Sequence, residues 1–157
     1  MLQIMSNATL VKFGLPATLI ADYKHWAVLL RPAQVTLGSL VLGAKGDWLA
    51  FSQIPPQAFA ELAHVTRCLE TGLRNFCAYD KINYLMLMMV DPHVHFHVIP
   101  RYARLQRFED IDFPDSGWPG QPNLAGATAI SPETQSDRKS TRLNSSHIQK
   151  SRMPSSA

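Results

Sequence analysis

The chain has 157 residues, 46% of them hydrophobic and 17% charged, with a formal net charge of +3. This length and composition predict one globular domain, and no apolar run is long enough to cross a membrane as a helix. Residues 1–7 lack the basic and apolar regions of a signal peptide, and the two cysteines do not indicate a disulfide framework. We therefore expect a cytoplasmic protein with no membrane partner.

The basic charge is concentrated in residues 137–157, which hold five of the 15 Lys and Arg residues but one of the 12 Asp and Glu residues. The rest of the chain is close to neutral, so its charge does not predict a nucleic-acid-binding protein. Residues 137–157 resemble the translation of a standard short-read DNA sequencing adapter, and we expect a non-native, disordered tail there. A natural disordered basic tail is the alternative. The natural domain is then expected over residues 1–136.

Strands are predicted at four places in the first third of the chain. We expect a short edge strand at residues 10–13 and a strand segment at 19–23. A buried strand is predicted at 25–31, where Pro32 ends it, and a second apolar strand at 39–43.

A long amphipathic helix is predicted over residues 55–76. Behind Pro55-Pro56, apolar residues recur at three- and four-residue steps and form one stripe. The nearly continuous apolar run at 82–90 then predicts a central strand, and we interpret its methionines as core filling rather than as a metal or cofactor site. Asp91-Pro92 predicts a tight connection to a strand that returns antiparallel.

Residues 103–130 are predicted to form a long, proline- and glycine-rich loop of the kind that often carries function. Trp118 in this loop either lies over a site or fills a gap, and we favour packing. Ser131-Pro132-Glu133 predicts a helix start, with an N-cap, a proline at the first helical position and an acid in the first turn. We expect a natural C-terminal helix that the adapter-like tail interrupts.

The stretch with the clearest chemical signal is His93-Val94-His95-Phe96-His97. The histidines alternate with apolar residues at the strand period, so all three imidazoles are expected on one face. Rings that titrate near neutral pH suit proton transfer, nucleophilic attack or metal ligation. A neutral imidazole can attack phosphorus, and a second ring about 7 Å along the strand can protonate the leaving group. We interpret His25 and His64 as surface or boundary histidines.

The stretch His93 to Ile99 matches His-φ-His-φ-His-φ-φ, where φ is hydrophobic, and so resembles the histidine triad superfamily of nucleotide hydrolases and transferases. The following Pro100-Arg101 resembles its diadenosine-polyphosphate hydrolase branch, and the likeness covers about residues 20–102. The resemblance implies an α+β fold, with an antiparallel sheet of about five strands, one long helix and a short C-terminal segment. It also implies a homodimer with one continuous sheet.

By position, the resemblance makes His95 the nucleophile that takes a nucleotidyl group from an α-phosphate. His97 becomes the leaving-group acid, and His93 orients the site. Ser39, Leu30 and Arg101 become substrate-binding positions, although the family usually has a histidine at the first and an acid or asparagine at the second. Val90-Asp91-Pro92 stands where many members carry Gly-Gln-Ser/Thr. The implied partner is a small-molecule nucleotide, with no cofactor beyond a divalent metal bound to it.

Two other interpretations stay open. A non-catalytic nucleotide-binding module would account for the missing contact residues. A metal site would use His93, His95 and His97 as ligands, but three alternating rings on a straight strand spread over about 13 Å. No cluster of cysteines or acids near them completes a ligand shell.

Overall fold

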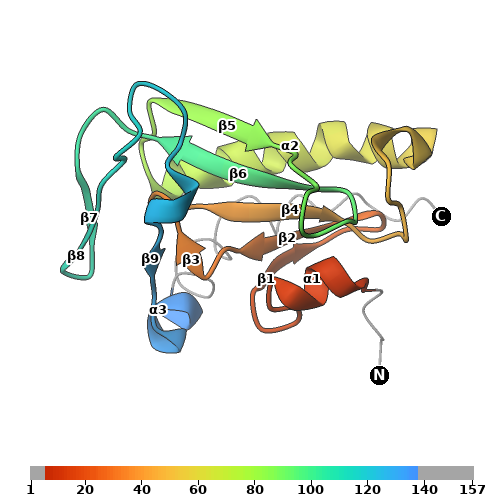
Figure 1. The fold of residues 1–157 in the computed structure, drawn as a ribbon, viewed down its shortest axis with the longest axis horizontal. Coiled ribbons are helices and arrows are strands. Elements are labelled where there is room, and N and C mark those ends of the chain that lie inside the picture. The colour runs from red at the N-terminus through yellow and green to blue at the C-terminus, as the bar shows by residue number, and fades with distance from the viewer. Residues whose placement is uncertain (1–5, 138–157) are drawn as a thin grey trace.

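The computed structural model describes residues 6–137, coloured in Figure 1. The adapter-like sequence beyond Asp137, and the disorder expected of it, lie outside the described residues.

A five-stranded antiparallel sheet forms the centre of the fold, in the order β1-β2-β4-β6-β5. Its strands are β1 (Leu19–Asp22), β2 (Trp26–Leu30), β4 (Leu40–Ala44), β5 (Lys81–Leu85) and β6 (His95–Arg101). Together with one long helix, this sheet confirms the predicted α+β fold. The strands predicted at 19–23, 25–31 and 39–43 correspond to β1, β2 and β4.

Helix α2 (Pro56–Phe76) covers one face of the sheet, seen behind it in Figure 1. Its stripe, which includes Val65, Leu69 and Leu73, packs on alternate residues of β2 and β4 and is fully buried. The periodicity of the sequence predicted this helix because its apolar residues recur on one face of the helix, the face that is buried. The same packing fixes which residues of each strand point away from α2.

Helix α1 (Ala8–Lys12) lies on the opposite face of the sheet, in front of it in Figure 1. The prediction of a strand at 10–13 is therefore wrong. The Asn7 side chain caps the helix by accepting a hydrogen bond from the Leu10 amide at 3.1 Å. Leu10 packs with Leu29 over Gly43, where an added Cβ would lie 2.3 Å from Leu10 Cδ2. The conformation of this five-residue segment is therefore determined by the Asn7 cap and by the packing of Leu10, and not by its sequence pattern.

The strand predicted at 82–90 is only half formed. Strand β5 ends at Leu85, which lies opposite His97 at the edge of the sheet, and residues 86–94 form an irregular connection. The backbone of Met88 is left-handed, with φ of 51°, and Met89 is 86% exposed. The prediction of methionines as core filling is thus wrong for Met89. The apolar run lines a surface hollow instead of continuing the sheet.

Short elements complete the fold. They are β3 (Ala33–Gln34) paired with β9 (Thr128–Ala129), the hairpin β7 (Gln106–Phe108) and β8 (Ile111–Phe113), the 3₁₀ turns η1 (Phe51–Gln53) and η2 (Leu124–Gly126), and α3 (Pro132–Asp137). The start of α3 is as predicted, because Ser131 Oγ accepts a hydrogen bond from the Thr134 amide at 3.2 Å. Over residues 6–137, no helix is long and apolar enough to cross a membrane.

Candidate active site

His95 and His97 lie on the face of the sheet that α2 leaves uncovered. In the antiparallel pair with β4, His95 is opposite Gly43 and His97 is opposite Val41. Their ring centroids are 5.0 Å apart and the rings are nearly perpendicular, with 2% and 8% of the two residues exposed. The prediction that alternation along a strand brings the three rings to one face is confirmed for His95 and His97, whereas His93 precedes the strand.

The ring of His95 is held in one orientation by the backbone of His93. Its Nδ1 lies 2.7 Å from the His93 carbonyl oxygen. A carbonyl oxygen only accepts hydrogen bonds, so Nδ1 carries the proton and Nε2 keeps its lone pair. This is the tautomer that a nucleophilic imidazole needs.

His97 is neutral at pH 7. Its pKa is lowered to about 4, mainly by burial and also by the charges of His95 and Arg31, which together outweigh the opposing charge of Asp91. Its Nδ1 is buried and has no hydrogen-bond partner among the described residues. A negative charge bound beside this ring would favour its protonated form and raise its pKa.

His93 precedes β6 and contacts two residues from distant parts of the chain. Its Nδ1 lies 3.0 Å from Thr9 Oγ1 in α1, and its Nε2 lies 2.8 Å from Asp47 Oδ1. Both ring nitrogens are therefore occupied. His93 is in place to position its own carbonyl group against His95 rather than to react itself.

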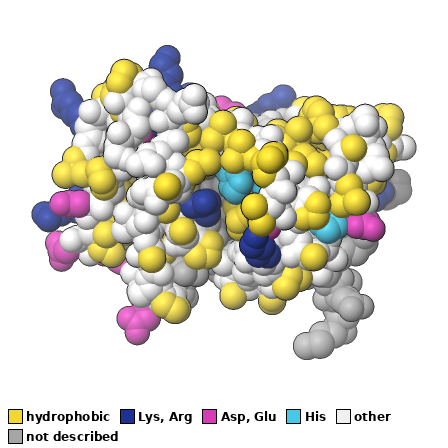
Figure 2. Space-filling model, viewed as in Figure 1, with side chains coloured by type: hydrophobic (Ala, Val, Ile, Leu, Met, Phe, Trp, Pro, Cys, Tyr) yellow, Lys and Arg dark blue, Asp and Glu magenta, His cyan; other side chains and the backbone are white. Residues whose placement is uncertain are grey.

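A small cavity of about 130 Å³ opens beside His95 and His97. The irregular connection after β5 forms its other wall, with the lining residues Leu87, Met88, Met89, Val90 and Asp91. Phe13, which follows α1, lies 5.5 Å from the His95 ring and 5.7 Å from the His97 ring, centroid to centroid. Figure 2 shows histidine side chains at the surface of this face, one of them in a hollow bordered by hydrophobic side chains and by Lys or Arg.

The structure does not bring Ser39 or Leu30 to this cavity. Ser39 is fully buried, and its hydroxyl donates to the Thr36 carbonyl at 2.8 Å and accepts from the Thr36 amide at 3.1 Å. Leu30 belongs to the core under α2, on the face away from His95. These positions stabilise a turn and the core, and their substrate contacts stay predictions.

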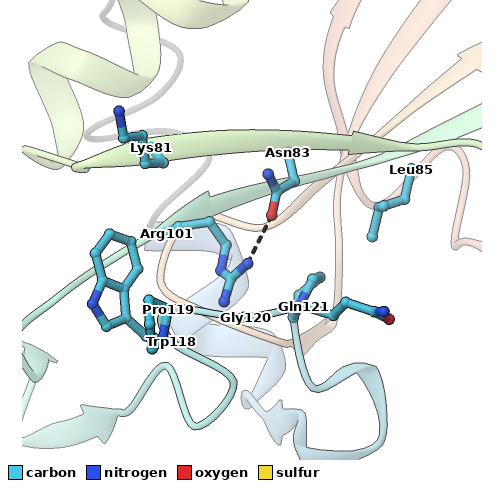
Figure 3. A pocket seen from close by; sticks show the side chains of 9 residues that line it. Lys81, Asn83, Leu85, Arg101, Trp118, Pro119, Gly120 and Gln121 are labelled. Atoms are coloured by element: carbon cyan, nitrogen blue, oxygen red, sulfur yellow. Dashed lines mark hydrogen bonds between the residues drawn. The ribbon is translucent and has the colours of Figure 1, made fainter.

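Arg101 lies on the same face as His97 but in a second cavity of about 500 Å³. Its Nε and Nη2 donate to Asp115 at 2.7 and 3.0 Å, and its Nη1 donates to Asn83 Oδ1 at 2.8 Å (Figure 3). Trp118 is half-buried and lines this cavity, and the packing role favoured for it stays a prediction.

Arg31 does not line the cavity, and its Nη1 donates to the Ala33 carbonyl, but its charge acts on His97, which the sequence did not predict. It follows β2 and is close enough for its charge to lower the pKa of His97. Its Nε is buried and has no hydrogen-bond partner among the described residues, and burial lowers the pKa of its guanidinium. Alternation along the strand could have predicted that Arg31 lies on the histidine face, because Arg31 is two residues from Leu29, whose side chain packs on that face.

Solved structures with this fold are histidine triad proteins. The chain matches one from Sinorhizobium meliloti 1021 with a TM-score of 0.71 and 20% identity, over 92% of this chain and 97% of that chain. A second, from Bradyrhizobium japonicum, matches with a TM-score of 0.64 and 18% identity, over 87% and 96%. The chain has the histidine triad fold.

A hypothetical histidine triad nucleotide-binding protein from Sulfolobus tokodaii strain7 also matches, with a TM-score of 0.61 and 20% identity over 91% of this chain and 88% of that chain. No family model and no curated protein sequence matches the chain. At 18–20% sequence identity these similarities establish the fold alone. The chemistry depends on the side chains of this chain.

The geometry gives no support to the metal alternative. Within residues 6–137, no group of three or more His, Cys, Asp or Glu side chains is arranged to hold a metal ion. His93 turns its nitrogens to Thr9 and Asp47, and His95 uses Nδ1 on a carbonyl, so the three rings do not converge.

Proposed function

We propose that the protein is a nucleotide hydrolase or transferase that acts at an α-phosphate through a nucleotidyl-His95 intermediate. The observation that carries this proposal is the 2.7 Å contact between His95 Nδ1 and the His93 carbonyl oxygen, which leaves Nε2 free beside the cavity. The nucleotide-binding description of the Sulfolobus tokodaii protein, which shares the fold, agrees with it. Phosphoric anhydrides and phosphoramidates are the substrate classes.

In the first step, His95 Nε2 attacks the α-phosphorus and forms an N–P bond. The bond from phosphorus to the leaving group breaks, and its electron pair stays with the leaving group, which takes a proton from His97. Water or another acceptor then attacks the phosphorus and gives its proton to the now neutral His97, while the N–P bond breaks and its electron pair returns to His95 Nε2.

The low pKa of His97 fits this scheme once a substrate is bound. The protein surroundings alone keep His97 neutral, with a pKa of about 4. An anionic phosphate beside the ring offsets the burial and the Arg31 charge that keep it neutral, so binding supplies the acid form. In this scheme the Arg31 charge, which acts on His97, also attracts the phosphate, and its buried Nε has no partner among the described residues.

Binding without catalysis is the second candidate. The connection 86–94 brings apolar side chains and Asp91 to the cavity, and no hydroxyl or amide side chain of that connection lines it. Such a wall offers a phosphate less stabilisation than hydrogen-bond donors would. A nucleotide would then bind without leaving an adduct on the protein.

We also propose a homodimer. Strand β5 lies at the edge of the sheet, and no described strand pairs with its outer side. An unpaired edge is a template for pairing with a second chain. Light scattering coupled to size-exclusion chromatography measures the mass directly.

The decisive experiment is intact-mass spectrometry after brief incubation with nucleoside phosphoramidates and dinucleoside polyphosphates. The expected result is a mass increase of one nucleotidyl group, which appears more slowly in His97→Gln because the leaving group loses its proton donor. His95→Ala abolishes the increase. His64→Ala, a histidine on α2 that packs against Tyr23, is the matched control and keeps it. An adduct that survives in His95→Ala, or no adduct and no hydrolysis with any substrate, overturns the proposal.

A further inference from the structure

The larger cavity lies on the same face of the sheet as His97, next to the histidine cavity but with different lining residues. It lies between β5, β6 and residues 118–122 (Figure 3). Leu85, at one end of it, is opposite His97, and Lys81, at the other end, is opposite Arg101. The cavity therefore begins at the residue opposite His97 and extends along the strand for four residues, about 13 Å.

Trp118 forms an aromatic wall of this cavity. Its side chain is half-buried and packs against neither of the two hydrophobic core clusters. Pro119 and Pro122 also line the cavity. Leu85 and Asn83 lie on its β5 side (Figure 3). An indole that lines an open, mostly apolar space can take a planar ring, because aromatic stacking tolerates any ring with a π-face.

The loop that carries Trp118 is held in place before any ligand binds. Asp115 accepts two hydrogen bonds from Arg101 and one from the Tyr102 amide at 3.1 Å. The Trp118 amide donates to the Asp115 carbonyl at 3.1 Å, and at Gly117 an added Cβ would lie 2.0 Å from the Gln121 carbonyl oxygen. A wall fixed in this way loses little conformational entropy when a ring stacks on it.

The charge in this cavity favours a neutral ring over a phosphate. The guanidinium of Arg101 is fully buried against Asp115, whose side chain is 1% exposed, so its positive charge is compensated within the protein. Asn83 gives its oxygen to Arg101, which leaves its amide N–H groups for a ring nitrogen or carbonyl. Near His97, by contrast, Arg31 has a buried nitrogen with no partner among the described residues.

We propose that this cavity is a binding site for a planar heteroaromatic ring, stacked on Trp118, and that the ring belongs to the leaving group of the substrate. The role of the ring as part of the leaving group rests on the proposed function, whereas the ring site itself does not. Substrates whose leaving group carries such a ring on a spacer would then reach from the histidines to Trp118.

Binding is tested first, without catalysis. A ¹⁵N-labelled sample of the full chain shows three indole N–H signals, for Trp26, Trp48 and Trp118, and Trp118→Phe assigns the last. Titration with the free nucleosides adenosine and guanosine is expected to shift the Trp118 signal. The Trp26 signal, whose indole donates to the Ala58 carbonyl in the core, stays in place and reports folding.

Kinetics then tests the link to the histidine site. Turnover is compared for two substrates that carry the same nucleotide. The leaving group of one bears a heteroaromatic ring, and that of the other does not. Trp118→Ala is expected to raise KM for the ring-bearing substrate roughly 5- to 100-fold, the range measured for loss of base–aromatic stacking, with little change for the other. Trp118→Phe keeps a ring face and recovers most of the loss. Leu105→Ala, an exposed apolar residue outside both cavities, is the control.

The outcomes separate this proposal from the proposed function. A nucleoside-dependent Trp118 shift without any turnover supports the ring site and counts against the enzyme. Turnover with equal effects of Trp118→Ala on both substrates overturns the leaving-group role, and an unmoved Trp118 signal overturns the ring site. A Trp118 signal that changes with protein concentration instead of ligand assigns the cavity to a protein interface and also overturns it.

Discussion

The His93 carbonyl oxygen and His95 Nδ1, 2.7 Å apart, join two neighbouring histidines with different tasks. One is held by side chains from outside the sheet, and the other is free to react through its second nitrogen. Because the contact runs through the backbone of His93, anything that shifts His93 also shifts the reactive ring.

Loss of the Thr9 hydroxyl is expected to disturb His95 indirectly. Thr9 is 2% exposed, and its Oγ1 lies 3.0 Å from His93 Nδ1. Thr9→Val leaves that nitrogen buried without a partner and is expected to reduce the free energy of unfolding by about 1–3 kcal/mol, measured by urea denaturation. It should also slow formation of the nucleotidyl adduct. Asp47→Asn is the control, because Asp47 is 90% exposed and its pair with His93 is expected to add little stability.

His97 is expected to make the free energy of unfolding decrease as the pH falls below neutrality. Its pKa is about 4 in the folded protein and 6.5 when unperturbed, so the unfolded chain binds this proton first. The stabilisation is complete above pH 6.5 and is lost as the pH falls through 4, with a size of about 1–2 kcal/mol after allowance for partial exposure. His97→Gln should flatten this part of the curve of unfolding free energy against pH. An unchanged slope would show that His97 is not held neutral.

Arg31 is expected to control the protonation of His97. Its charge is one of the causes that lower the pKa of His97, so Arg31→Met should raise that pKa. Titration of the His97 ring protons by NMR measures the change. In the proposed mechanism the same variant loses a cation that attracts the phosphate, and kcat should fall about 10- to 1000-fold. A pKa that stays the same or falls would place Arg31 outside the electrostatics of the site.

The Arg101–Asp115 pair is expected to be essential for the loop that holds Trp118. Burial raises the pKa of Asp115, but the hydrogen bonds from Arg101 and the Tyr102 amide and the Arg101 charge lower it more, and the net pKa lies below its ordinary value. Asp115→Asn leaves Arg101 buried without a counter-charge and should cost about 3–5 kcal/mol. Because the folded pKa is lowered, the pair's contribution is present above pH 4 and is lost in stronger acid.

A second ion pair provides the control for that measurement. Arg107 and Asp112 lie 2.9 Å apart across the β7–β8 hairpin, but 65% and 49% of their side chains are exposed. Asp112→Asn should therefore cost less than about 1 kcal/mol. Equal losses in the two variants would contradict the distinction between a buried and an exposed pair. Chemical denaturation monitored by circular dichroism compares them directly.

The sequence by itself determined the elements whose pattern repeats. Helix α2 follows from an apolar stripe over its whole length, and the common face of His95 and His97 follows from alternation along a strand. Both patterns are local, so neither needs knowledge of what packs against them. The five-stranded sheet was expected from the resemblance that the histidine motif supports.

Only the tertiary structure decided what the surrounding segments do. Leu10 lies in a helix because Asn7 caps that helix and Gly43 leaves room for the Leu10 side chain. The apolar run after Leu85 does not continue the sheet but lines the histidine cavity. The partners of His93 and Arg101 are Thr9 and Asp115, 84 and 14 residues away. Such contacts depend on where distant segments of the chain meet, which the local periodicity of the sequence cannot predict. They determine how the histidine rings are oriented and how the Arg101 charge is compensated, and the proposed chemistry depends on both.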